Sequence, residues 1–71
     1  MKHEWIGEYW LIAEEYKTYK QEWVEVSVNL GKCLGNDEAC TKAITALMRD
    51  FPAAKLRNVY ILDGWGHLIY M

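Results

Sequence analysis

The sequence predicts a small α+β fold, in which a four-stranded antiparallel sheet carries one amphipathic helix on one face, in the order strand, strand, helix, strand, strand. Three observations predict it. One segment has apolar residues at helical spacing, the segment before it alternates strictly between apolar and polar residues, and an Asp-Gly pair near the end separates two further apolar runs. With 71 residues, we expect a single domain over residues 1–71.

The helix is expected over about residues 37–50, because apolar residues recur there every three or four positions. Asn36 suits the N-cap, and Pro52 stops the helix by pushing Phe51 out of helical geometry. Ile44 and Leu47 are the expected anchors on the core. The predicted apolar face consists of Cys40, Ala43, Ile44, Leu47, Met48 and Phe51.

The first two strands are expected to form a hairpin. Residues 23–30 alternate and are rich in valine, which is typical of a half-buried strand. Residues 5–16 are apolar and aromatic, and the polar stretch after them suits a turn over residues 18–21. That turn places Leu11 opposite Val28, which puts the valines on one face and Trp10 on the other.

The last two strands are expected on either side of Asp63-Gly64, a strong hairpin signal. A two-residue turn pairs Leu62 with Trp65 and Tyr60 with His67. The side toward the helix then carries Val59, Ile61, Leu68 and Tyr70, and the other side carries Tyr60, Leu62, Trp65, His67 and Ile69. Gly66 allows an alternative, since a longer loop over residues 63–66 exchanges the faces of the last strand.

The side of the sheet away from the helix is unusually apolar, because the uncovered face of such a sheet is normally polar. Two interpretations stay open: the strands curl to close this face or the register differs by one residue, or the face is a partner surface for a second copy or another protein. The predicted partner-binding residues are Trp10, Trp23, Tyr60, Trp65, His67 and Ile69.

The sequence indicates no catalytic, metal or cofactor chemistry, so we expect a non-enzymatic protein. A catalytic site needs a nucleophile or base with an orienting partner, and no such motif surrounds His67 or Ser27. Six residues separate Cys33 from Cys40, which is not zinc-knuckle spacing, and both are expected to be free thiols.

The composition bears on the kind of partner. Ten acidic residues against eight basic ones give a net charge of −2 without a basic run, which disfavours anionic membranes and nucleic acid. No stretch matches a membrane span or a secretory signal, so we expect a cytoplasmic protein. The alternative function is single-stranded nucleic-acid binding, with bases stacked on the sheet aromatics.

In size and composition the chain resembles the small inhibitor proteins of phages and mobile elements, such as anti-CRISPR proteins. It shares with them a short acidic chain, many aromatic residues and the absence of a catalytic motif. The resemblance implies a protein that occludes the surface of another protein, and it assigns no residue a role. The expected function is therefore a protein-binding module, and we expect a homodimer.

Overall fold

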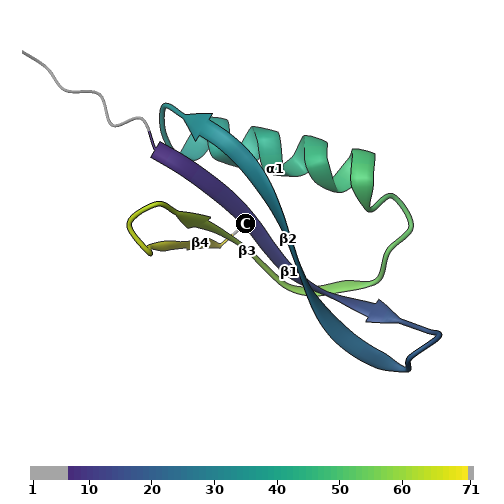
Figure 1. Ribbon diagram of the computed structural model, residues 1–71. Coiled ribbons are helices and arrows are strands. Elements are labelled where there is room, and N and C mark those ends of the chain that lie inside the picture. The colour runs from purple at the N-terminus through teal and green to yellow at the C-terminus, as the bar shows by residue number, and fades with distance from the viewer. Residues whose placement is uncertain (1–6, 71) are drawn as a thin grey trace, which may run out of the picture.

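The computed structural model describes residues 7–70 and shows a four-stranded antiparallel sheet with one helix (Figure 1). The order of the strands in the sheet is β2-β1-β3-β4, and each neighbouring pair is antiparallel. The predicted fold class is confirmed. The elements are β1 (Gly7–Lys17), β2 (Glu22–Cys33), α1 (Asn36–Asp50), β3 (Leu56–Asp63) and β4 (Leu68–Tyr70).

The hairpin of β1 and β2 has the predicted register. Leu11 lies opposite Val28, and the turn occupies residues 18–21, with Gln21 at a positive φ of 55°. The pairing shifts near the far end of the hairpin, where Tyr9 lies opposite Gly31 but the next residue lies opposite Asn29. A β-bulge of this kind bends the strand and increases its twist.

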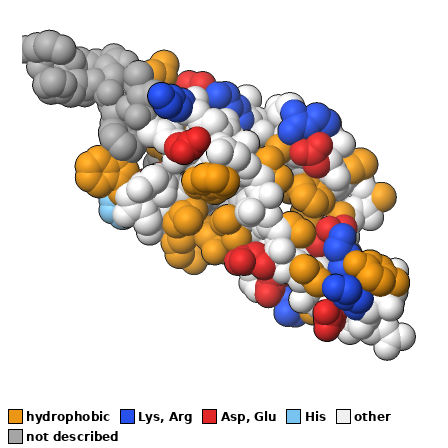
Figure 2. All heavy atoms as spheres, viewed as in Figure 1, with side chains coloured by type: hydrophobic (Ala, Val, Ile, Leu, Met, Phe, Trp, Pro, Cys, Tyr) orange, Lys and Arg blue, Asp and Glu red, His pale blue; other side chains and the backbone are white. Residues whose placement is uncertain are grey.

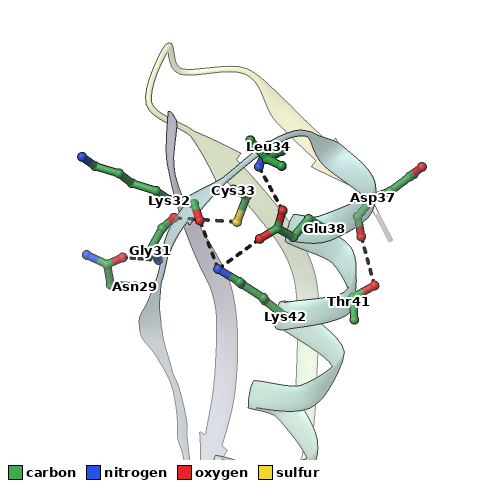
Figure 3. Close-up of polar contacts among 9 residues, drawn as sticks. All are labelled: Asn29, Gly31, Lys32, Cys33, Leu34, Asp37, Glu38, Thr41 and Lys42. Atoms are coloured by element: carbon green, nitrogen blue, oxygen red, sulfur yellow. Dashed lines mark hydrogen bonds and ion pairs between the residues drawn. The ribbon is translucent and has the colours of Figure 1, made fainter. Parts of the chain in front are cut away.

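The helix covers residues 36–50, close to the predicted range, but its N-cap differs. Gly35 occupies the cap, and Asn36 is the first helical residue. The Asn36 side chain instead accepts a hydrogen bond from the Tyr9 hydroxyl at 3.5 Å. Glu38 takes part in holding the helix start, because its carboxylate accepts the Leu34 N–H at 3.2 Å (Figure 3). The helix ends before Phe51, which has a φ of −132° and precedes Pro52, as predicted.

The helix presents a different face to the sheet from the one predicted. Its buried residues are the alanines Ala39, Ala43 and Ala46, and Leu47 packs partly against the core. Ile44, predicted as an anchor, is 50% exposed, and Met48 is 72% exposed. The apolar residues span a wider arc than the sheet contacts. Small alanine side chains let the helix approach the strands closely, so the helix buries the alanine edge of that arc.

The core lies between α1 and the near face of the sheet. Its buried residues are Tyr9, Leu11, Leu30, Cys33, Ala39, Ala43, Ala46 and Ile61. Burial raises the pKa of the Cys33 thiol, and its Sγ lies 3.7 Å from the carbonyl oxygen of Gly31 (Figure 3). Cys40 packs against the same core as a small apolar side chain.

The C-terminal hairpin has the longer loop, so the predicted two-residue turn is wrong. Ile61 pairs with Ile69 and Leu62 pairs with Leu68, which shifts the register by an odd number of residues. The Asp63 carboxylate stabilises the loop by accepting the backbone N–H groups of Trp65 and His67 at 2.9 and 2.8 Å.

Because of this shift, the side chains of β4 point to the opposite sides of the sheet from those predicted. Ile69 lies on the helix side and packs against the core, whereas Leu68 and Tyr70 lie on the open side. The predicted strand over residues 65–71 is reduced to three residues in the structure. Its final residue, Met71, and the predicted strand positions 5 and 6 lie outside the described residues.

Candidate functional site

The face of the sheet opposite α1 carries an apolar patch built from three adjacent strands, β1, β3 and β4. Pairing across the strands brings its members together, since Trp10 lies opposite Leu62 and Ile12 lies opposite Tyr60. Figure 2 shows hydrophobic side chains gathered over the middle of the visible face. The apolar patch consists of Trp10, Ile12, Tyr60, Leu62, Leu68 and Tyr70.

The outer edge of the apolar patch is its most exposed part. Tyr70 is 73% exposed and Leu68 is 49% exposed, although each lies directly opposite a residue of β3. The ring planes of Tyr60 and Tyr70 make an angle of 54°, and their centroids are 6.1 Å apart. The patch is therefore a set of neighbouring side chains, part of which is open to solvent in the isolated chain.

The structure brings together only two of the six predicted partner-binding residues. Trp10 and Tyr60 belong to the apolar patch. Trp65 and His67 are exposed in the loop between β3 and β4, beside the patch and outside the paired strands. The placement of Ile69 on this face is wrong, because the longer loop turns it toward the core.

Trp23 lies on the same face at the opposite end of the sheet. Its ring meets the Tyr16 ring edge-on at 5.3 Å, and the Arg57 guanidinium lies over it at 4.1 Å. Such cation–π contacts are typically worth about 0.5–1 kcal/mol at an exposed site. Part of the Trp23 ring surface is therefore in contact with Tyr16 and Arg57 of the same chain.

Arg57 reaches this position because β3 is irregular beside it. The register shifts between Ile12 and Glu14, and Asn58 has a positive φ of 54°. Glu14 then accepts hydrogen bonds from Arg57 at 2.9 Å and from Asn58 at 2.7 Å. Both bonds lower the pKa of the Glu14 carboxyl and keep it ionised. The bond from Asn58 has the larger effect, and the bond from Arg57 has the smaller one.

Leu68 and Tyr70 are the members that sequence reasoning assigned to the wrong face. The signal for them was Gly66, which has a positive φ of 88° in the loop. Glycine adopts this conformation without the steric penalty of a side chain, so Gly66 favoured the longer loop over the two-residue turn.

The loop also contains the one close contact between histidine and aspartate in the described part of the chain. His67 Nδ1 lies 3.2 Å from Asp63 Oδ2. Desolvation alone raises the pKa of Asp63, but the hydrogen bonds from the His67 and Trp65 backbone and the nearby imidazole outweigh it, so that the pKa is lowered. The carboxylate stabilises the loop. The Ser27 hydroxyl and the Cys33 thiol lie on β2, which β1 separates from β3.

Charged groups around the apolar patch are mostly acidic. Glu8, Glu14 and Glu25 flank it on β1 and β2, and Asn29 donates a hydrogen bond to Glu8 at 3.2 Å. Within residues 7–70, no group of three or more histidine, cysteine or acidic side chains is arranged to hold a metal ion. In that same range, α1 lacks the length and hydrophobicity needed to cross a membrane.

Comparisons of the chain with protein-family models, with curated proteins and with solved structures found no match.

Proposed function

We propose that the protein is a non-enzymatic binding module and that its apolar patch docks on another protein. The observation that carries the proposal is the position of the patch. Six apolar side chains from three adjacent strands lie together on the side of the sheet that α1 does not cover. Soluble proteins rarely expose contiguous apolar surface beyond a few hundred Å² unless a partner covers it.

The residue types of the apolar patch suit the centre of a protein interface. Tyrosine and tryptophan are enriched there, because each offers a large contact area with few rotatable bonds. Leu68 and Tyr70 supply the exposed part of this surface. The acidic residues at the rim, Glu8 and Glu25, favour a partner with basic residues around an apolar centre.

A finer proposal concerns the consequence of binding. A docked binding module covers part of its partner's surface and keeps other molecules from that part. We propose inhibition by occlusion in the cytoplasm, in the manner of the anti-CRISPR proteins that this chain resembles in size and composition. The proposal of occlusion depends on the docking surface and fails if the apolar patch binds no protein.

Binding of single-stranded nucleic acid has less support. Base stacking on a sheet requires cations that are free to contact phosphates. The cation nearest the open-face aromatics, Arg57, is already bonded to Glu14 at 2.9 Å, and Lys55 lies over the Tyr16 ring at 5.6 Å.

Two exposed tyrosines provide a matched test of the docking surface. Tyr70 lies in the apolar patch, and Tyr19 lies in the turn of the first hairpin with a similar exposure, 76%. A partner should be retained from cell lysate by the wild-type protein and by Tyr19→Glu, and lost with Tyr70→Glu. Circular dichroism checks that both variants remain folded.

Retention of the same partner by folded Tyr70→Glu, together with its loss from Tyr19→Glu, would move the docking surface to the hairpin turn. If no partner is retained by any of the three proteins, the proposed function is contradicted for that cell extract.

A further inference from the structure

The sheet has two edges of very different length. β4 forms one edge with three residues, and β2 forms the other with twelve. Proteins usually protect a long edge strand with lysine, proline, a bulge or a covering element, because its unpaired backbone groups attract another strand. The bulge of β2 and its Lys32 lie beyond residue 29. Before them, residues 23–29 contain no lysine and no proline, and Glu25 is their one charged residue.

Hydrogen bonding identifies the backbone groups that face outward from this edge. The Tyr16 N–H donates to the Lys55 carbonyl at 3.0 Å, so Tyr16 directs its backbone toward β3. In a strand, the backbone N–H and C=O groups of successive residues point alternately to the strand on one side and to the strand on the other side. The odd-numbered residues of β1 therefore bond to β2, where they lie opposite Val24, Val26 and Val28. The outward N–H and C=O groups consequently belong to Trp23, Glu25, Ser27 and Asn29.

We infer that a second copy of the chain pairs antiparallel along this edge, with a two-fold axis at Val26. The four outward residues are spaced evenly about Val26. The outward backbone N–H and C=O groups of one copy therefore all lie opposite those of the other copy. Trp23 then lies opposite Asn29 of the second copy, and Glu25 lies opposite its Ser27. Each of these pairs exchanges two backbone hydrogen bonds.

Side chains on both faces favour this pairing. On the helix side, Val24 meets Val28 of the second copy and the two Val26 side chains meet each other, which covers valines that are half-buried in the single chain. On the open side, each Glu25 carboxylate meets a hydroxyl and not another carboxylate. An axis at Glu25 would oppose two like charges.

The helix lies closer to one end of this edge than to the other. It approaches this edge at the Val28–Leu30 end, where Thr45 and Arg49 line a cavity of about 220 Å³. The Trp23–Val26 end belongs to the part of the hairpin that turns away from α1 (Figure 1). The pairing yields one eight-stranded sheet with both apolar patches on the same side, and so a bivalent docking surface.

The test uses one position with two substitutions. Ser27→Pro removes an outward N–H that the single chain does not use, and proline is tolerated at such edge positions. Ser27→Ala keeps the N–H. Light scattering should give the mass of two chains for the wild type and Ser27→Ala, and half that mass for Ser27→Pro with unchanged helical circular dichroism. A monomeric wild type at high concentration, or a dimeric Ser27→Pro, would overturn the inference.

Amide hydrogen exchange provides a second measurement that needs no variant. When nine-tenths of the chains are paired, the Glu25 and Ser27 amides should exchange about tenfold more slowly than in dilute monomer. The Val26 amide, which bonds to β1, serves as the internal reference and should change less. Equal exchange at Glu25 and Ser27 across a concentration range that spans dimerisation would contradict edge pairing.

The dimer and the docking surface are separable. Tyr70→Glu should leave the solution mass at two chains, because Tyr70 lies on β4, at the other edge of the sheet. A monomeric but folded Tyr70→Glu would assign self-association to the apolar patch and overturn the pairing along β2.

Discussion

The sheet has two apolar faces with different surroundings. The face under α1 places Leu11 and Ile61 in a closed core, with exposures of 1% and 0%. The opposite face places Ile12 and Leu62 on the same strands, one residue further along, where no element of the described chain covers them. Both faces of the sheet are apolar in composition. Only the face that the helix covers is buried. An apolar face without a covering element is a candidate for binding.

The largest expected effect compares the same substitution on the two faces. Leu11→Ala should lower the free energy of unfolding by about 2–5 kcal/mol, because it leaves a cavity in a closed core. Leu62→Ala should lower it by about 1 kcal/mol or less, since solvent already reaches that side chain. Urea unfolding measures both. Equal losses would show that the open face is closed within the single chain.

The next comparison is between two adjacent positions of α1. Ala43→Leu should destabilise the protein by about 1–3 kcal/mol, because the buried alanine leaves no space for a larger side chain. Ile44→Ala should cost less than about 1 kcal/mol, since Ile44 is half exposed and alanine is the better helix former. Thermal unfolding measures both losses. A larger loss of stability for Ile44→Ala than for Ala43→Leu would show that the helix packs through the face that the residue spacing alone predicted.

A smaller effect is expected at the loop that sets the faces of β4. The lowered pKa of Asp63 means that its stabilising contribution is complete above the pKa of an unfolded aspartate, about 4, and is lost as pH falls through the lower folded value. Asp63→Asn removes this titration and should flatten the acid side of the stability curve. Thermal unfolding between pH 2 and pH 6 measures the difference, and superimposable curves would contradict the assigned role.

The smallest expected signal concerns nucleic acid. If the open face binds protein, a mixed single-stranded oligonucleotide should give no saturable binding at low salt. A fluorescence anisotropy titration measures this. Binding that weakens steeply with added salt, and further with Tyr60→Ala, would favour base stacking on the open face over protein docking.

Local patterns predicted the parts of this fold that local physics determines. The strict alternation of residues 23–30 predicted β2, and the polar turn gave the correct pairing of Leu11 with Val28. Pro52 correctly predicted the helix end. These features depend on the preferences of neighbouring residues and on a turn that closes a single hairpin.

The parts that differed depend on choices between nearly equivalent arrangements. The apolar residues of α1 span a wide arc, so the helix could face the sheet in more than one rotation about its axis. In the structure, close packing buries Ala43 and leaves Ile44 exposed. The Asp-Gly pair allowed two loop lengths, and the hydrogen bonds from the loop backbone to Asp63 accompany the longer one. As a result, Ile69 moved to the core and Tyr70 moved to the candidate site.

The most direct test of the central claim is side-chain footprinting of the protein alone and with its retained partner. The account predicts that Tyr70 and Leu68 are labelled by hydroxyl radicals in the free protein and protected in the complex, while Tyr19 is labelled equally in both. Protection of Tyr19 with unchanged labelling of Tyr70 would contradict docking through the apolar patch.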